Sequence, residues 1–309
     1  MKIAIFGGGG FIGSTITDSL LLAGHTVKVF ERPRIPPYRK FSDYENVTWL
    51  TGDYLNSNDV RDAISGCDAV VHLISSTLPK NSNDDPIYDV QTNVIPTIQL
   101  LNEMVKSEIK KIVFISSGGT VYGSTECETI PESHPLQPQV SYGITKLTIE
   151  NYLYLYKKIH GICPVILRVS NPYGERQRVN LAQGAVAVFL NKVINNEIIE
   201  IWGSGDVVRD YIHVSDVAAA FITALTYDGD NNIFNIGSGV GTSLNQLLDA
   251  IEHITTHKVE RKYLPNRSID VNRNVLNIDL AKRELQWTPK ISLVDGIART
   301  FTWMEMNNK

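Results

Sequence analysis

Residues 1–24 read MKIAIFGGGGFIGSTITDSLLLAG, and this stretch decides the fold. The apolar run from Ile3 to Phe6 predicts a short strand that ends in glycines, and the apolar residues between Phe11 and Ala23 recur at helical spacing. A strand, a glycine-rich turn and a helix in this order are typical of the first unit of a dinucleotide-binding βαβ series. The N-terminal sequence therefore predicts a parallel α/β sheet with a phosphate-binding turn after its first strand.

Three glycines of this turn, Gly7, Gly10 and Gly13, stand in the frame G-x-x-G-x-x-G. The first permits a tight turn, the second lets the backbone approach a pyrophosphate, and the third lets the helix pack closely on the strand. Unpaired N–H groups at the start of the helix, at Phe11 and Ile12, and the positive end of the helix dipole would hold the phosphates. A glycine-rich turn without a ligand is the alternative, and the strand–turn–helix context argues against it.

Strand and helix signals continue to alternate to about residue 170. Strands are expected at residues 25–31, 47–50, 69–73, 111–115 and 165–169, and helices at 59–64, 88–105 and 142–160. Further helices are expected at 183–194, 215–225, 243–254 and 293–304, separated by short strands and turns. We therefore expect a Rossmann-like, doubly wound parallel sheet in residues 1–170 and a smaller mixed lobe in residues 171–309, with some segments interleaved.

The composition limits the class of protein. A net charge of −4 argues against a protein whose main task is to bind nucleic acid, and no run approaches the roughly 20 apolar residues of a membrane helix. The apolar start is too short for a signal peptide. Cys67, Cys127 and Cys163 lack the spacing of a zinc site or a disulfide framework, and His72 and His213 lie inside apolar runs that predict burial. We expect a cytoplasmic protein without a metal.

Two carboxylates are candidates for binding the adenosine part of a dinucleotide. Glu31 ends the second expected strand, where a carboxylate accepts hydrogen bonds from ribose hydroxyls and repels a 2′-phosphate, which favours NAD. Arg32 could instead accommodate the 2′-phosphate of NADP, so that cofactor stays open. Asp53 follows the third strand and could accept from the adenine amino group, with a turn-capping role as the alternative.

Tyr142 and Lys146 form Y-x-x-x-K near the start of a long expected helix and lie on one face of it. We expect the Lys146 ammonium to lower the pKa of the Tyr142 phenol and to hold the nicotinamide ribose, so that Tyr142 transfers a proton. Two surface residues at helical spacing are the alternative. The position of the pair after a fifth strand in a dinucleotide-binding order favours the functional interpretation.

Five segments of the chain resemble the extended short-chain dehydrogenase/reductase family, the group of sugar-nucleotide epimerases, dehydratases and reductases. They are GGGGFIG (7–13), SSGGTVYG (116–123), SYGITK (141–146), LRVSNPYG (167–174) and VRDYIHVSDVA (208–218). The resemblance implies an enzyme with a nicotinamide cofactor in the first lobe and a nucleotide-diphospho-sugar in the cleft to the second. It also implies that Tyr142 is the proton donor or acceptor and Lys146 its partner.

The chain departs from the family at residue 118, a glycine where a catalytic Ser or Thr is usual. Ser117 and Thr120 flank this position, and either could donate the second hydrogen bond to the sugar oxygen; we favour Thr120. The Asp–Glu pair of the dehydratases is also missing, since the sequence reads Gly118-Gly119-Thr120. Without those carboxylates the elimination of water lacks its acid and base, which argues against a 4,6-dehydratase.

The resemblance also implies a set of substrate-binding residues. Asn171 and Arg209 match positions that contact the diphosphate, and Arg267 and Asp270 in PNRSID match phosphate and nucleoside ribose contacts. Arg178 is a weaker candidate. Arginine suits this task because its guanidinium binds phosphate in a bidentate manner, although a solvated surface charge is the alternative for each arginine.

Two reactions use such a site. A ketoreductase binds NAD(P)H and reduces a dTDP-4-keto-6-deoxyhexose at C4, a step of deoxysugar and surface polysaccharide biosynthesis. A UDP-hexose 4-epimerase acts on UDP-glucose or UDP-N-acetylglucosamine and keeps NAD tightly bound. The chain is short for the resembled epimerases, which favours the reductase over the epimerase. A non-catalytic cofactor-sensing regulator is disfavoured because Tyr142 and Lys146 are both present.

The long expected helices at 88–105 and 142–160 carry apolar residues on more than one face. In the second helix these are Leu147, Tyr154 and Leu155 on one side, and Ile149, Tyr152, Tyr156 and Ile159 on the other. One stripe can pack on the sheet and the other needs a partner. The resemblance implies that this partner is a second copy of the chain, so we expect a homodimer with a four-helix interface.

Overall fold

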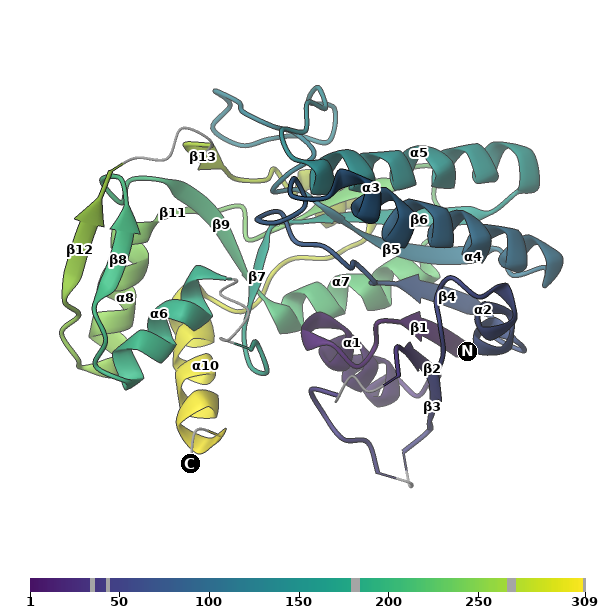
Figure 1. Ribbon diagram of the computed structural model, residues 1–309, viewed down its shortest axis with the longest axis horizontal. Coiled ribbons are helices and arrows are strands. Elements are labelled where there is room, and N and C mark those ends of the chain that lie inside the picture. The colour runs from purple at the N-terminus through teal and green to yellow at the C-terminus, as the bar shows by residue number, and fades with distance from the viewer. Residues whose placement is uncertain (34–36, 43–44, 179–183, 266–270, 308–309) are drawn as a thin grey trace.

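The computed structural model describes residues 1–33, 37–42, 45–178, 184–265 and 271–307. A large lobe surrounds a parallel sheet, and a small lobe beside it holds the C-terminus (Figure 1). Within these residues the large sheet has seven strands in the order β10-β6-β5-β4-β1-β2-β3. The strands are β1 Lys2–Phe6, β2 Thr26–Glu31, β3 Val47–Thr51, β4 Ala69–His72, β5 Lys111–Ser117, β6 Cys163–Val169 and β10 Ile233–Ile236.

Alternate side chains of each strand enter two separate cores, one on each face of the large sheet. Ile3 and Ile5 of β1 point into one core, and Ala4 and Phe6 point into the other. One face is covered by α1 Phe11–Leu22, α7 Val214–Thr226 and α9 Asp279–Glu284, and the opposite face by α2 Ser57–Ile64, α4 Ile95–Lys106 and α5 Ser141–His160 (Figure 1). The expected Rossmann-like, doubly wound sheet is confirmed.

The helix expected at 88–105 is interrupted. It consists of α3 Pro86–Asp89, a π-helical turn η1 Val90–Val94, and α4. Pro96 has no N–H to donate to the carbonyl four residues earlier, which breaks the α-helical hydrogen-bond ladder. The Asn93 side chain lies in this turn and accepts from the N–H of Ser76 at 2.8 Å. A π-helical turn inside a helix is often found at functional sites.

The small lobe is a mixed structure, as expected. Its central strand β9 Val208–His213 pairs in parallel with β7 Asn171–Tyr173 and β13 Arg273–Asn274, and antiparallel with β11 Gly241–Ser243. A separate parallel pair joins β8 Ile199–Trp202 to β12 Arg261–Leu264. The helices of this lobe are α6 Ala185–Ile194, α8 Leu244–Thr255 and α10 Leu293–Asn307.

Two segments that follow residue 171 in the chain belong to the large lobe. Strand β10 pairs with β6, and α7 packs against α1 and β5. The boundary between residues 170 and 171 itself stays a prediction. Among the described helices, none has the length and apolar character needed to cross a membrane.

Candidate active site

Two adjoining pockets are candidates for the site, one at the carboxyl ends of the large sheet's strands and one within the small lobe. The glycine-loop pocket has a volume of about 530 Å³ and is lined in part by predicted site residues: Gly7, Gly10, Phe11, Ile12, Gly13, Ser117, Thr120, Tyr142, Lys146 and Asn171. The small-lobe pocket has a volume of about 350 Å³ and is lined by residues of β7, α6, β8 and β9. Asn171 and Pro172 line both pockets, which therefore meet at β7.

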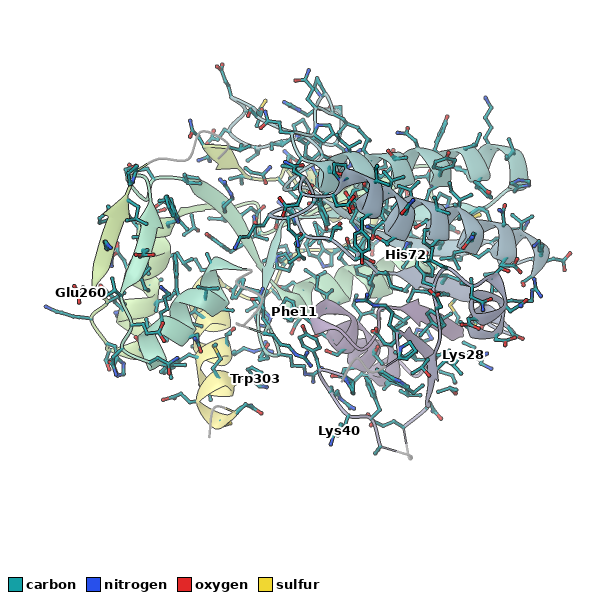
Figure 2. The ribbon with its side chains drawn as sticks, in the orientation of Figure 1. Phe11, Lys28, Lys40, His72, Glu260 and Trp303 are labelled. Carbon is teal, nitrogen blue, oxygen red and sulfur yellow. The ribbon has the colours of Figure 1, made fainter. Side chains whose placement is uncertain are left out.

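The glycine loop fits a pyrophosphate. Gly7 has a φ of +90°, and a Cβ on Gly13 would lie only 2.0 Å from the Gly7 carbonyl oxygen, so both positions require glycine. A Cβ on Gly10 would meet only that oxygen, at 3.5 Å, and would otherwise occupy free space in the pocket. No side chain caps α1, which leaves its first N–H groups available to a ligand. Phe11, at the start of this helix, lies between the two lobes (Figure 2).

Glu31 is hydrogen-bonded to the glycine loop, whereas the Asp53 side chain is hydrogen-bonded within its own turn. Oε1 of Glu31 accepts a hydrogen bond from the Gly9 N–H at 2.8 Å, and burial raises the pKa of this carboxyl, although the Gly9 bond and Arg32 act in the opposite direction. Asp53 is exposed, and its Oδ1 accepts from the Leu55 N–H at 2.9 Å. This hydrogen bond is a turn-capping contact, and the contact of Asp53 with the adenine amino group stays a prediction.

Lys146 is almost completely buried beside Tyr142. Its Nζ donates to the Ile115 carbonyl oxygen at 3.0 Å, and lies 4.8 Å from the centre of the Phe114 ring and 5.5 Å from that of the Tyr142 ring. Burial lowers the pKa of the Lys146 ammonium to about 8. The Y-x-x-x-K pair thus lies in one pocket with the glycine loop, as the pattern predicts.

The expectation that Lys146 lowers the pKa of Tyr142 is wrong for this structure. Burial raises the pKa of the Tyr142 phenol to about 12, and a hydrogen bond with Ser75 offsets only part of that rise. The reason is the burial of the phenol, and the Lys146 ammonium donates to the Ile115 carbonyl oxygen at 3.0 Å. The protein alone therefore keeps Tyr142 as a protonated donor at neutral pH.

A buried carboxylate that the sequence analysis missed holds the start of α5. Asp89 accepts hydrogen bonds from the hydroxyls of Thr77 at 2.6 Å, Ser141 at 2.7 Å and Thr145 at 3.0 Å, and from Nδ2 of Asn93 at 2.9 Å. These donors come from three separate segments. The carboxylate thus ties the helix that carries Tyr142 and Lys146 to the π-helical turn, and its charge raises the pKa of Lys146 against the effect of burial.

Both candidate hydroxyls, those of Ser117 and Thr120, line the glycine-loop pocket. Oγ1 of Thr120 is buried and has no hydrogen-bond partner in the described part of the chain, as expected of a group that awaits a ligand. Gly118 faces elsewhere, since a Cβ there would lie 2.5 Å from Cδ1 of Leu276 and 3.1 Å from the Arg168 carbonyl oxygen. A side chain at residue 118 would therefore point away from the pocket.

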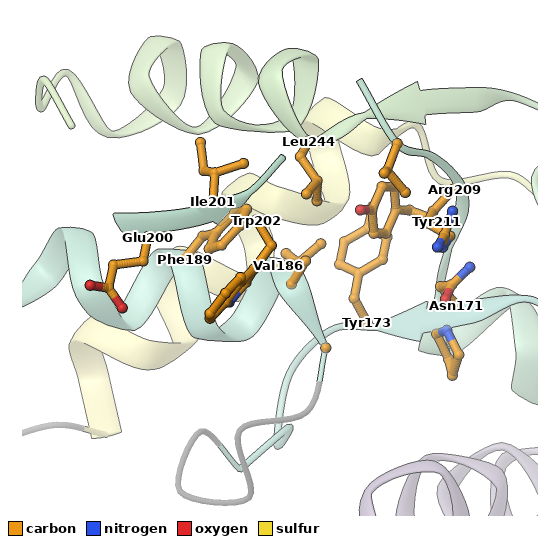
Figure 3. Close-up of a pocket in the computed structure, with 14 residues that line it drawn as sticks. Asn171, Tyr173, Val186, Phe189, Glu200, Ile201, Trp202, Arg209, Tyr211 and Leu244 are labelled. Carbon is orange, nitrogen blue, oxygen red and sulfur yellow. The ribbon is translucent and has the colours of Figure 1, made fainter. Parts of the chain in front are cut away.

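The predicted substrate residues separate into three groups. Arg209 and Asn171 lie together at one end of the small-lobe pocket, and Phe189 and Trp202 lie toward its other end (Figure 3). Arg178 lines neither pocket in the described structure, and its guanidinium stacks 3.8 Å above the ring centre of Tyr38. The remaining two, Arg267 and Asp270, lie outside the described residues.

Arg209 also contacts its own lobe. Its Nη1 donates to the Val271 carbonyl oxygen at 2.7 Å and to the Val208 carbonyl oxygen at 2.9 Å. Nδ2 of Asn171 donates to the Asp210 carbonyl oxygen at 3.1 Å. Both side chains are thereby held at the pocket's polar end, next to the glycine-loop pocket. In the described ranges, no group of three or more His, Cys, Asp and Glu side chains could hold a metal ion.

Comparisons with known proteins point to one family. A family model described as the NAD dependent epimerase/dehydratase family matches residues 3–237. A putative UDP-glucose 4-epimerase of Methanocaldococcus jannaschii is 37% identical over 99% of each chain. A dTDP-4-dehydro-6-deoxyglucose reductase of Escherichia coli is 34% identical over 96% of this chain and 95% of its own. The crystal structure of a Thermotoga maritima UDP-glucose 4-epimerase with UDP-glucose has a TM-score of 0.94 and 33% identity, with 100% of both chains covered.

Proposed function

The chain belongs to the NAD-dependent epimerase/dehydratase family, and from this we propose that it is a UDP-hexose 4-epimerase that keeps NAD bound in its glycine-loop pocket. One observation carries the proposal: the pocket of Tyr142 and Lys146 meets the small-lobe pocket at Asn171 and Pro172. A ligand that spans both pockets would have its sugar beside the Tyr142 phenol and its nucleotide in the small lobe. A nucleotide-diphospho-sugar has this two-part form, with the charged diphosphate in the middle.

The residues that line the glycine-loop pocket, together with Glu31 beside the loop, suit NAD. The N–H groups at the start of α1 would bind the pyrophosphate, Glu31 the adenosine ribose, and Lys146 the nicotinamide ribose. When bound, NAD supplies the ability to accept a hydride and return it. Glu31 favours NAD over NADP because its carboxylate, held beside the loop by the Gly9 N–H, would repel a 2′-phosphate.

Tyr142 moves the proton in this proposal. Its phenolate takes the proton from the sugar C4 hydroxyl in one direction, and the resulting phenol returns that proton to the C4 oxygen in the other. The raised pKa of Tyr142 favours the donating form, and the nearby Lys146 ammonium would stabilise the phenolate that remains after donation. Thr120 would donate a second hydrogen bond to the same oxygen, which its unpartnered Oγ1 supports.

A C4 ketoreductase acting on a dTDP-4-keto-6-deoxyhexose is the second candidate. The observation in its favour is the E. coli reductase, which is 34% identical over nearly the whole chain. The epimerase takes precedence because a putative UDP-glucose 4-epimerase has 37% identity and a solved UDP-glucose 4-epimerase has a TM-score of 0.94. The two differ in the fate of the cofactor, since a reductase must release oxidised NAD(P) after each turnover and an epimerase must not.

The test separates the candidates by cofactor demand. Purified protein is incubated with UDP-glucose, and separately with UDP-N-acetylglucosamine, without added cofactor, and products are resolved by chromatography. Conversion to the C4 epimer supports the proposal. If neither sugar is converted and the protein instead oxidises NADH or NADPH with dTDP-4-keto-6-deoxyglucose, the reductase replaces the epimerase.

We also propose that the protein is a cytoplasmic homodimer, joined through the outer faces of α5 and the segment before α4. Tyr154 is 64% exposed and Ile159 56% exposed, and Leu155 and Ile87 add to the same kind of surface. The sequence places Ile159 with Ile149, Tyr152 and Tyr156 on one stripe of the helix. In the structure Ile159 lies in the last turn of α5 and is exposed, whereas Ile149 and Tyr156 are buried. Light scattering should give twice the chain mass of 34.4 kDa, and the mass of one chain would overturn this assignment.

A further inference from the structure

The segment that leaves β7, residues 174–178, runs along the wall of the glycine-loop pocket. We call it the strap. Gln177 of the strap lines this pocket, and its Oε1 is buried without a hydrogen-bond donor in the described residues. Nε2 of the same amide lies close to Gly184, where a Cβ would come within 2.4 Å of it. The buried amide oxygens of Gln99 and Asn274 also lack a donor in the described residues, but Gln177 differs from them because it lines this pocket, where a ligand could donate an N–H or O–H to it.

The residues on both sides of Gln177 fasten the strap to the large lobe. Nη2 of Arg176 lies 2.7 Å from Oδ2 of Asp18 on α1, the helix that begins in the glycine loop. The guanidinium of Arg178 stacks 3.8 Å above the Tyr38 ring, and the Tyr38 N–H donates to the Gly9 carbonyl oxygen at 2.9 Å. Both attachments therefore end on the structure that forms the glycine loop.

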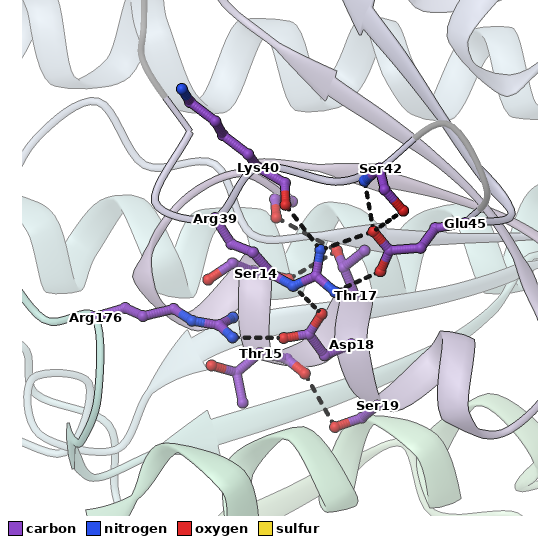
Figure 4. A network of polar contacts seen from close by, with 12 residues as sticks. Ser14, Thr15, Thr17, Asp18, Ser19, Arg39, Lys40, Ser42, Glu45 and Arg176 are labelled. Atoms are coloured by element: carbon purple, nitrogen blue, oxygen red, sulfur yellow. Dashed lines mark hydrogen bonds and ion pairs between the residues drawn. The ribbon is translucent and has the colours of Figure 1, made fainter. Parts of the chain in front are cut away.

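Asp18 also forms an ion pair with a second arginine (Figure 4). Its other oxygen, Oδ1, lies 2.7 Å from Nε of Arg39, whose guanidinium also pairs with Glu45. One carboxylate thus connects α1, the segment after β2 and the strap, which are far apart in the sequence. The figure shows Asp18 between the two arginines, with each guanidinium directed at a different oxygen.

The strap is held from the small-lobe side too, and its backbone is constrained. Glu175 pairs with Arg299 of α10 at 2.9 Å and with His213 at 3.1 Å. Arg176 has a φ of +72°, a backbone conformation that a residue other than glycine adopts only where surrounding contacts enforce it. Along the strap, Glu175 therefore contacts the small lobe, Arg176 and Arg178 contact the large lobe, and Gln177 between them lines the pocket.

We propose that the strap closes the glycine-loop pocket over the bound dinucleotide: Gln177 accepts a hydrogen bond from it, and the Asp18–Arg176 and Tyr38–Arg178 contacts slow its release. This inference rests on the proposed function, because an epimerase must hold its cofactor through both hydride transfers. Arg178, expected at the diphosphate, has a cofactor-retaining role in this proposal.

The test measures release of the cofactor rather than turnover. Protein loaded with radiolabelled NAD is diluted into excess unlabelled NAD, and the label that stays bound is followed by filtration. Gln177→Leu removes the acceptor at nearly the same size and should speed release about fivefold, the effect of one lost hydrogen bond. Asp18→Asn, which weakens both ion pairs, should speed it roughly three- to tenfold, as expected for partly exposed pairs.

Two controls separate the strap from a general loss of structure. Asp249→Asn makes the same chemical change in an ion pair of equal length, 2.7 Å to Arg261, in the small lobe, and should leave release unchanged. The double variant Asp18→Asn/Arg176→Gln should release NAD no faster than Asp18→Asn alone, because both changes act on one contact. Circular dichroism melts confirm that each variant is folded at the assay temperature.

The outcomes distinguish this inference from the proposed function. The Gln177 and Asp18 variants could release NAD at rates within about 1.5-fold of the unchanged protein, as expected of a negligible contact. That result would overturn the proposed role of the strap in retaining NAD, even if the protein epimerises UDP-glucose. Faster release in these variants, with no epimerase activity in the unchanged protein, would retain the strap and overturn the epimerase. A protein that binds no NAD would overturn both.

Discussion

Gly118→Ser restores the hydroxyl that the family usually carries, and we expect it to harm the protein rather than improve catalysis. A Cβ at residue 118 would lie 2.5 Å from Cδ1 of Leu276 and 3.1 Å from the Arg168 carbonyl oxygen. The carbonyl cannot retreat, because Arg168 lies in β6 and pairs with Ser116 of β5. Leu276 is fully buried, so it must move into a filled core. Such overpacking destabilises proteins by about 1–3 kcal/mol.

Thermal melts test the magnitude. At about 2–4 °C per kcal/mol, a cost of about 1–3 kcal/mol means that Gly118→Ser should lower the Tm by roughly 2–12 °C. Gly119→Ser is a matched control, because a Cβ there meets only Oγ of Ser117, at an ordinary 3.8 Å. Leu276→Ala alone should cost about 2–5 kcal/mol, but less in the Gly118→Ser background, where it also removes the clash. An unchanged Tm together with a raised kcat in Gly118→Ser would refute this reasoning.

Three further predictions concern the reacting groups. Tyr142→Phe should lower kcat by ~10²–10⁴-fold while the bound NAD content stays the same, and a variant that keeps more than half of the kcat would contradict its role. Thr120→Val should lower kcat about a hundredfold, because it removes a donor to a developing oxyanion. Ser117→Ala should lower kcat by about fivefold or less. If both variants keep a kcat within about threefold of the unchanged protein, Tyr142 acts on the C4 oxygen alone. In cofactor-free protein, acetylation as a function of pH should show Lys146 half neutralised near pH 8, so that its ammonium is lost as the pH rises through that value. The unfolded chain keeps this proton up to about pH 10.5, so the contribution of Lys146 to the free energy of unfolding should rise as the pH rises from 8 to 10.5. Half-neutralisation of Lys146 near pH 10.5 in the folded protein would instead show that the site is hydrated.

The parts of the fold that depend on local sequence were predictable. Apolar runs and helical spacing marked the strands and helices of the large sheet, and the glycine frame marked the turn that lines the pocket. His72 and His213 are buried as expected, and His72 is hydrogen-bonded to Thr97 at 2.9 Å. Pro96 was the visible signal of an interrupted helix, but the π-helical turn also depends on the Asn93 contact with Ser76, which no local pattern reveals.

The parts that depend on contacts between distant segments were not predictable. Asp89 accepts hydrogen bonds from residues up to 56 positions away in the sequence, so nothing near it in the sequence indicates its burial. Arg168 offered a signal, because a charged residue inside an otherwise apolar strand requires a buried partner, and that partner is Glu150 at 2.6 Å. The prediction for the pKa of Tyr142 was wrong for a related reason, since spacing on a helix shows which side chains are neighbours and not how deeply the tertiary structure buries them.

The edge strand β10 has a consequence for how the protein is made. The chain leaves the large sheet after Val169 and returns to it only at Ile233, where β10 pairs with β6. During synthesis, β6 therefore waits with an open edge until the residues up to Ile236 have emerged from the ribosome, and by then much of the small lobe has been made. An open strand edge is a template for pairing with other chains. A nascent chain that stalls between residues 170 and 233 consequently keeps this edge of β6 exposed to pairing with other chains, which chaperone binding would prevent.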